Sequence, residues 1–152
     1  MKTAVFYHSY HHGNTKKILE AMAQQGQMEL VDAPSVEDFS PDTYDILGFA
    51  SGIYGFSVHD SVIQLARKIL PPSKPTFFVY TYGLNKGTGA DALRKIAQER
   101  GCPVLGEFSC RGYDTFGPFR WMGGLAKGHP DQQDLKMASD FFREIQNKWE
   151  RG

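Results

Sequence analysis

The sequence lacks an excess of charge, is poor in cysteine and contains no long hydrophobic run. Neither sign of charge is in excess, because 17 Lys and Arg residues balance 17 Asp and Glu residues and the pI is about 7.0. Such a chain lacks the basic patch that nucleic acids and anionic membranes attract. Only two cysteines occur, and no hydrophobic run is long enough for a secretory signal or a membrane span. We therefore expect a cytoplasmic protein without nucleic-acid or membrane partners, in which Cys102 and Cys110 are buried thiols.

Several catalytic motifs are also missing. G-x-x-x-x-G-K-[ST] and G-x-G-x-x-G do not occur, which argues against a nucleoside triphosphatase and against a dinucleotide-binding fingerprint. G-x-S-x-G is absent, so an esterase nucleophile elbow is not expected. Neither Cys-x-x-Cys nor His-Glu-x-x-His occurs, and we expect no metal site despite the five histidines.

What is present fits one globular domain. With 152 residues, 41% of them hydrophobic, the chain can bury roughly 68–70% of its unfolded surface, enough for one ordinary core. No repeat of 20–50 residues and no low-complexity segment is found. Residues 1–152 are therefore predicted to form a single domain.

Short runs of β-branched and aromatic residues alternate with segments of helical periodicity. Five such runs predict strands, at residues 3–7, 28–31, 45–50, 76–80 and 104–109. Apolar residues at helical spacing predict helices around residues 18–23, 62–70 and 93–97, and a last helix over residues 135–149. Because parallel strands need crossover connections, this order predicts an α/β fold with a parallel sheet and helices on both faces. For five strands we expect the doubly wound order 2-1-3-4-5.

Local signals locate the ends of these helices. Ser57-x-x-Asp60 and Thr88-x-x-Asp91 resemble capping boxes for the second and third helices, and Asp131 is the expected cap of the last. Residues 32–44 contain two prolines and are expected to hold at most one helical turn, after Ser35. In a sheet of this order, ligands bind beyond the carboxyl ends of the strands, so the loops after the first and third strands are expected to carry the site.

The loop after the first predicted strand has the composition of an anion site. It reads Ser9-Tyr10-His11-His12-Gly13-Asn14-Thr15 and leads directly into the first predicted helix. Free N–H groups at a helix start, the helix dipole and short hydroxyl or amide side chains can surround a phosphate without a cationic residue. Simple capping by Asn14 or Thr15 explains the same residues equally well when the loop is considered alone. Its place after the first strand favours a phosphate.

The loops after the third and fourth predicted strands combine glycines with aromatic residues. They read Ser51-Gly-Ile-Tyr-Gly-Phe-Ser57 and Thr81-Tyr-Gly-Leu-Asn-Lys-Gly-Thr88. A planar ring system needs an aromatic face to stack on and a backbone that can approach closely, and Tyr54 and Tyr82 are the candidate faces. Turn glycines and surface tyrosines would explain either loop alone. Two such loops beside a phosphate loop favour a ring-binding site.

Together, S-Y-H-H-G-N-T-K-K after the first strand, S-G-I-Y-G after the third and Y-T-Y-G after the fourth resemble the flavodoxin family over roughly residues 3–149. This resemblance implies noncovalently bound flavin mononucleotide (FMN). It places the phosphate on Ser9, Tyr10, His11, His12, Gly13, Asn14 and Thr15, and the isoalloxazine ring on Ile53, Tyr54, Gly55, Thr81, Tyr82 and Gly83. Two features differ from the usual pattern. Two histidines replace small hydroxyl residues in the first loop, and the acidic surface of electron-carrier flavodoxins is missing.

The resemblance implies a protein that transfers electrons between a reductase and an acceptor, with either a redox protein or a small electron acceptor as partner. An alternative is an NAD(P)H-dependent FMN reductase that acts on quinones or similar small acceptors. A second alternative is a binding or sensing module of the same fold without flavin. The long segment 110–130, which contains Tyr113, Phe116, Phe119 and Trp121, is expected either to form a lid or partner surface at the ring end or to pack as a cover on the last helix.

Overall fold

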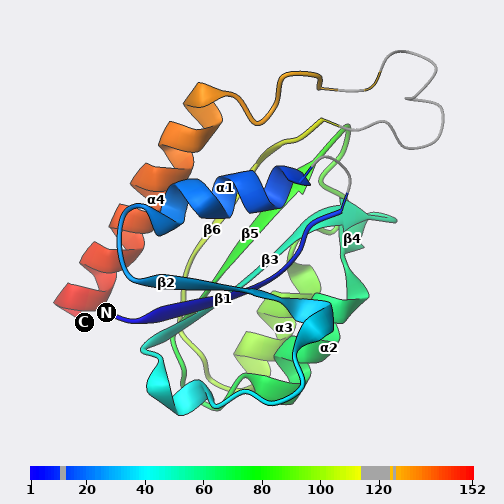
Figure 1. Ribbon diagram of the computed structural model, residues 1–152. Coiled ribbons are helices and arrows are strands. Elements are labelled where there is room, and N and C mark those ends of the chain that lie inside the picture. Colours follow the sequence, from blue (N-terminus) through cyan, green and yellow to red (C-terminus); the bar gives the residue numbers. More distant parts are fainter. Residues whose placement is uncertain (11–12, 114–123, 125) are drawn as a thin grey trace.

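The computed structural model describes residues 1–10, 13–113, 124 and 126–152 (Figure 1). Two of the predicted phosphate-loop residues, His11 and His12, lie outside these ranges, as do Phe116, Phe119 and Trp121 of the predicted lid. The expectations that concern these residues remain predictions.

A parallel sheet forms the centre of the fold. Its parallel strands follow the order β2-β1-β3-β5-β6, namely Met28–Asp32, Thr3–His8, Ile46–Tyr54, Thr76–Tyr82 and Val104–Arg111. A two-residue strand, β4 (Ser57–Val58), pairs antiparallel with the end of β3. The five predicted strands and their doubly wound order are thus confirmed, with β4 as an addition.

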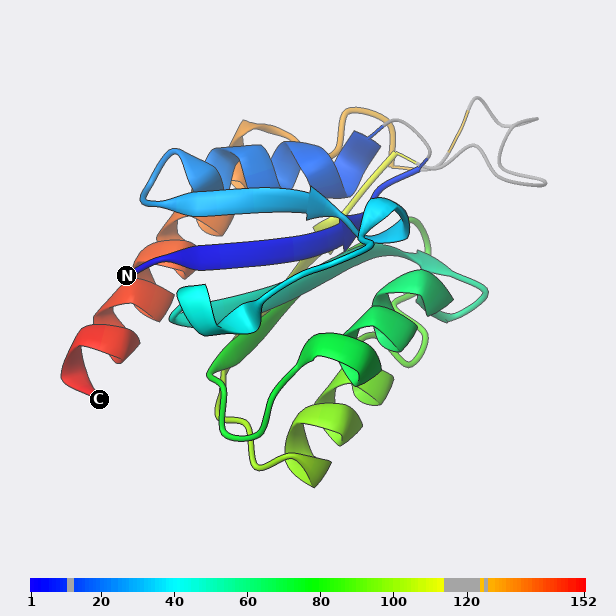
Figure 2. The ribbon, with the colours of Figure 1, turned by 60° about the horizontal axis from the view of Figure 1, so that its bottom comes forward.

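Two helices cover each face of the sheet (Figures 1 and 2). On one face lie α1 (Asn14–Ala23) and α4 (Gln132–Arg151), and on the other lie α2 (Asp60–Ile69) and α3 (Asp91–Glu99). Side chains alternate between the faces of a strand, so Ala4 and Phe6 belong to the α2/α3 core while Val5 belongs to the α1/α4 core.

The third strand is longer than predicted. It was expected to end at Ala50 before a loop, but β3 continues to Tyr54 and turns back into β4. Gly55 and Phe56, the two central residues of the turn, both have positive φ, at 56° and 72°. Such turns match the twist of the paired strands and so close a two-residue hairpin. Ile53 and Tyr54, which were predicted to bind the ring, therefore lie on a hairpin strand.

Two of the three predicted caps are wrong. The N-cap of α2 is His59, whose side chain accepts the N–H of Ser61, and Ser57 lies in β4. No side chain caps α3 at Ala90, because Thr88 instead donates its backbone N–H and its hydroxyl to the carbonyl of Phe56. Asp131 caps α4 as predicted and forms a full capping box with Asp134.

The connection from β2 to β3 also differs from the prediction. Short 3₁₀ turns occupy Ala33–Ser35 and Pro41–Thr43, so the first turn ends at Ser35, where it was expected to begin. A proline lies in the first turn of each, because its fixed φ suits that position and its missing N–H loses no hydrogen bond there.

Both cysteines are buried free thiols, as expected. Burial raises the pKa of Cys102. Burial, together with the nearby carboxylates of Asp134 and Asp131, raises the pKa of Cys110 to about 12. Neither cysteine therefore has the thiolate character of a reactive nucleophile.

Candidate functional site

The carboxyl ends of β1, β3, β5 and β6 lie at one edge of the sheet (Figure 1). A cleft of about 300 Å³ is lined by residues at the ends of these strands and in the loops that follow them. Parallel strands present their carboxyl ends at one edge, so residues far apart in the sequence meet there. The described residues that line it are Ser9, Tyr10, Asn14, Thr15, Gly52, Ile53, Tyr54, Gly55, Thr81, Tyr82, Gly83, Gly112 and Tyr113. The three loops singled out in the sequence therefore contribute to one wall.

One end of the cleft is built by the start of α1. Gly13 adopts φ 64° as the N-cap residue and donates its N–H to the carbonyl of Tyr10, and it is not part of the cleft wall. Ser9 Oγ accepts the backbone N–H of Lys16 at 3.2 Å. The next two residues, Asn14 and Thr15, do line the cleft. No lysine or arginine is among the described lining residues, so the helix dipole and polar hydrogens provide the positive potential at this end.

Three buried polar side chains lie at this end. Thr15 and Thr81, 1% and 4% exposed, share a hydroxyl hydrogen bond of 2.9 Å that joins the first loop to the end of β5. Asn14 donates its amide to the carbonyl of Tyr113 at 2.8 Å. Among the described residues, the buried Oδ1 atom of Asn14 has no hydrogen-bond partner. A buried acceptor of this kind is suited to a donor on a ligand, such as a hydroxyl group.

The other end of the cleft is aromatic. The ring of Tyr54 lies over Gly52, where a Cβ atom would approach it to 3.1 Å, and its hydroxyl accepts the N–H of Tyr10 at 3.0 Å. Tyr82 lines the opposite loop, and the ammonium group of Lys86 lies 5.3 Å from the centre of its ring. Both tyrosines predicted to face a planar ligand therefore belong to the cleft wall.

An exposed aromatic residue at this end is held in an unfavourable conformation. Phe56 is 71% exposed and has φ 72°, which is rare for a residue with a bulky side chain. Its carbonyl accepts two hydrogen bonds from Thr88, and Gly87 packs so closely that an added Cβ atom would lie 2.1 Å from the carbonyl oxygen. The loop after β5 thereby fixes the turn after β3.

Three lining residues were not among the predicted site residues, although the segment 110–130 with Tyr113 was expected either at the ring end or as a cover on the last helix. Gly52 was assigned to the loop only as part of a motif, and Gly112 and Tyr113 follow a strand that was expected to end at Ser109. Because β6 continues to Arg111, Gly112 reaches the cleft, where it leaves room for the amide of Asn14. The rule that ligands bind at the carboxyl ends of the strands therefore also applies to β6, the fifth of the parallel strands.

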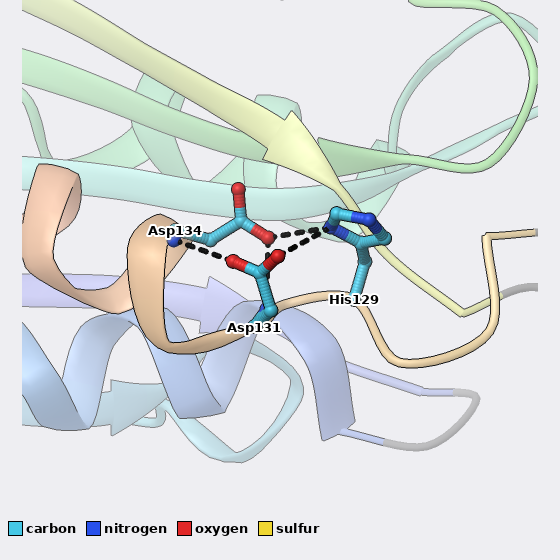
Figure 3. Close-up of side chains that lie close together, drawn as sticks. All are labelled: His129, Asp131 and Asp134. Atoms are coloured by element: carbon cyan, nitrogen blue, oxygen red, sulfur yellow. Dashed lines mark hydrogen bonds and ion pairs between the residues drawn. The ribbon is translucent and has the colours of Figure 1, made fainter.

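Figure 3 shows another cluster of polar side chains, at the start of α4. One side-chain atom each of His129, Asp131 and Asp134, of a kind that can bind a metal ion, lie within 4.8 Å of one another. The metal-binding motifs considered in the sequence do not include this grouping. Asp131 accepts the N–H of Asp134 at 2.9 Å, and Asp134 accepts the N–H of Asp131 at 2.8 Å and contacts His129 Nδ1 at 2.7 Å. The N–H of Asp134 is the main reason why the pKa of Asp131 is lowered, with His129 contributing. Helix capping accounts for Asp131 and Asp134, and His129 contacts both of these carboxylates through Nδ1.

Comparison with known proteins identifies the family. The family described as "Flavodoxin domain" matches residues 4–105. An uncharacterized protein of Methanocaldococcus jannaschii is 36% identical over 147 residues, covering 95% of this chain and 98% of that protein. The chain belongs to the flavodoxin family, which confirms the resemblance seen in the sequence.

Solved structures share the architecture. A flavodoxin from the domain Archaea superposes with a TM-score of 0.73 at 16% identity, covering 99% of both chains. A Fusobacterium nucleatum flavodoxin bound to flavin mononucleotide gives a TM-score of 0.66 at 13% identity, covering 97% of this chain and 99% of that chain. At these identities the similarity establishes the flavodoxin fold. Within the described part of the chain, no helix is both long enough and apolar enough to cross a membrane.

Proposed function

We propose that this protein binds FMN noncovalently in the cleft and carries electrons between a reductase and an acceptor. The observation that carries the proposal is the single cleft in which a helix N-terminus lies at one end and two tyrosines lie at the other. The FMN held by a flavodoxin of the same fold supports the choice of cofactor.

The polar end fits the phosphate and sugar chain of FMN. The first-turn N–H groups of α1 have no intrahelical acceptor, and Ser9 accepts only that of Lys16, so the helix start offers polar hydrogens and the positive end of the helix dipole, both of which favour a phosphate. The Thr15 hydroxyl lies beside them and can donate to the same anion. The unpartnered Oδ1 atom of Asn14 can accept a hydrogen bond from a ribityl hydroxyl. Ser9, Tyr10, Asn14 and Thr15 are thus the described residues proposed for this end, with Gly13 shaping the turn and His11 and His12 assigned by the family pattern alone.

The aromatic end fits the isoalloxazine ring. Tyr54 and Tyr82 offer flat faces, while Gly55 and Gly83 allow the backbone to approach the polar edge of a ring. Ile53 lines the same wall, and Thr81, whose hydroxyl bonds to that of Thr15, joins this part of the wall to the first loop. When bound, FMN supplies the electron-transfer chemistry, and the protein orients the ring, excludes water from it and tunes its potential through stacking and backbone hydrogen bonds.

The balance between positive and negative charges indicates how the protein would contact a redox partner. With 17 positive and 17 negative charges, the chain has no net field to attract an oppositely charged redox protein. Exposed apolar side chains do lie next to the cleft, with Tyr10 on its wall and Phe56 and Leu84 each following a lining glycine. We propose contact through such apolar residues, and therefore electron exchange that depends only weakly on salt.

Absorbance spectroscopy tests the proposal. Addition of FMN to the purified apoprotein should shift and resolve the visible flavin bands and quench the flavin fluorescence at a 1:1 ratio. Addition of a nicotinamide cofactor, with and without a quinone, then separates the alternatives. Rapid oxidation of the nicotinamide without a partner protein would favour the reductase, and failure to bind FMN would favour a module without flavin.

A further inference from the structure

A pair of stacked histidines lies beneath the aromatic end of the cleft. The rings of His8 and His59 are 3.8 Å apart and inclined by only 9°. His8 is the last residue of β1 and is 8% exposed, and His59 is the N-cap residue of α2. The stack therefore joins the strand that leads into the first loop to the helix that follows the hairpin.

Hydrogen bonds fix the position of His59. Its backbone N–H donates to Ser51 Oγ at 2.9 Å, which ties it to β3. Its Nδ1 atom accepts the N–H of Ser61 at 3.2 Å and lies 2.8 Å from the hydroxyl of the same serine. Because Nδ1 is the acceptor of a backbone N–H, the proton of the neutral imidazole must be on Nε2. His59 is thus held in one orientation and provides a rigid surface for His8.

Tyr54 lies alongside both histidines. Its ring centre is 5.4 Å from that of His8 and 5.3 Å from that of His59, with interplanar angles of 77° and 86°. Equal distances to two stacked rings place Tyr54 beside the stack, since a ring above one member would be farther from the other. If the edge of the Tyr54 ring pointed at the imidazole edges, atoms of the rings would overlap at this separation. The imidazole edges must therefore point at the face of the Tyr54 ring. Edge-to-face contact of this kind is the favourable arrangement for aromatic rings.

Tyr54 links this stack to both ends of the cleft. It lines the cleft, and its hydroxyl accepts the N–H of Tyr10, next to Ser9 in the first loop. Tyr10 in turn lies nearly parallel to His8, with ring centres 5.5 Å apart. The plane of Tyr54 is therefore determined by two imidazoles and one backbone N–H.

We propose that His8 and His59 are positioning residues for the flavin: their stacked imidazoles fix the plane of Tyr54 and thereby set the affinity and reduction potential of the ring. This rests on the proposed function, because it assumes that Tyr54 faces the bound isoalloxazine. Removal of one imidazole leaves Tyr54 with one of these two edge contacts, so its ring turns more freely and stacks less well on a ligand.

The positioning should weaken in acid. Burial and the adjacent His59 lower the pKa of His8, while Asp32 at the end of β2 acts in the opposite direction. Among the described residues, Tyr10 and Tyr54 are the other titratable side chains in ring contact with His8. Below the ordinary value of 6.5 the unfolded chain takes up a proton that the folded chain resists, so this contribution to stability is complete above pH 6.5 and falls as the pH is lowered.

Three variants test the proposal. His8→Phe keeps a flat buried ring but cannot be protonated, whereas His8→Ala removes the ring. His59→Asn keeps a good N-cap for α2 but removes the stacked ring, which separates capping from stacking. In the apoprotein, near-ultraviolet circular dichroism of the tyrosines and NMR titration of the imidazoles report on Tyr54 and His8 without any flavin.

We expect His8→Ala and His59→Asn to lower the affinities for FMN and for riboflavin equally, by roughly 3- to 10-fold, and to shift the flavin potential. His8→Phe should retain both values at neutral pH and lose the acid dependence. Unchanged tyrosine dichroism and an unchanged potential in all three variants, or a loss in His8→Phe as large as that in His8→Ala, would overturn the positioning role. If the wild-type protein binds no flavin, the proposed function fails, and the proposal for the flavin fails with it. The apoprotein spectra would then show separately whether the stack positions Tyr54.

Discussion

The two edges of the sheet differ in how their polar groups are hydrogen-bonded. At the amino edge, the N–H of Lys2 donates to Asp45 at 2.7 Å, and the ammonium group of Lys74 donates to the carbonyl of Tyr44 at 2.8 Å. Tyr44 also donates its hydroxyl to Glu29, and Arg100 binds backbone carbonyls at the end of α2. These contacts close the edge and stabilise the fold.

The carboxyl edge contains buried polar atoms without partners and residues in rare conformations. In the described part of the chain, His8 Nδ1 and Asn14 Oδ1 are buried and unpartnered, and Phe56 has a positive φ. At the amino edge, the described residues include one such atom, the Thr3 hydroxyl, and one positive φ, at Ser73 with 62°. Unsatisfied groups persist where a site requires them, because elsewhere they only reduce stability. The two unpartnered atoms of His8 and Asn14 therefore mark the carboxyl edge as the functional one.

Among these predictions, we expect the largest effect on stability from the substitution of a tightly packed glycine. Gly87 and Gly101 have similar φ values, 58° and 63°, but an added Cβ would meet the carbonyl of Phe56 at 2.1 Å in the first case and no described atom within 4 Å in the second. Gly101→Ala should lower the free energy of unfolding by about 1–2 kcal/mol from backbone strain alone. Gly87→Ala adds the steric overlap, roughly a further 1–3 kcal/mol, and displaces the turn after β3. Urea denaturation measures both, and equal losses would contradict the role assigned to the loop after β5.

A pair of buried threonines tests the function of each edge. Thr15 at the carboxyl edge bonds to Thr81, and Thr76 at the amino edge donates to the carbonyl of Leu47 at 2.6 Å. Hydrogen bonds to charged groups contribute about 1.5–3 kcal/mol, so Thr15→Val should weaken FMN binding roughly 10- to 100-fold.

Riboflavin is the matched ligand for this test. Because it has no phosphate, its affinity should change less in Thr15→Val. Thr76→Val should lower the free energy of unfolding by about 1 kcal/mol and leave both affinities unchanged. Fluorescence titration with the two flavins gives the comparison, and an equal loss for both in Thr15→Val would argue against a phosphate at this end.

The smallest effect is expected at the amino edge in alkali. The hydrogen bond to Glu29 and burial raise the pKa of Tyr44 from 10.0 to about 12. The stability that comes from this shift is complete below pH 10 and is lost as the pH rises toward 12. Tyr44→Phe should remove that part of the alkaline destabilisation, as measured by unfolding and by the absorbance of tyrosinate. An identical alkaline profile in the variant would show that other groups cause the loss.

The elements and much of the site could be predicted because their signals are local. Periodicity along residues 3–7 or 135–149 indicates which face is buried, and alternation of strands and helices restricts the sheet to few orders. Ser9, Thr15, Tyr54 and Tyr82 could be assigned to one site because the carboxyl ends of parallel strands meet. The cap of α2 was missed because His59 is seldom an N-cap, and the end of β6 because strand boundaries depend on pairing partners.

The sequence by itself predicted the strands, their doubly wound order, the helices on both faces and the loops that form the cleft, since these follow from local spacing, composition and the order of the elements along the chain. Only the tertiary structure decided how the cleft residues are held. The bond from Asn14 to Tyr113 joins residues 99 positions apart, and the stack of His8 on His59 forms because β1 and the start of α2 are brought together by the register of β1 on β3. Such contacts depend on the relative placement of whole elements, which no local pattern encodes. The fold could therefore be predicted from the sequence, whereas the geometry around Tyr54 depends on tertiary packing.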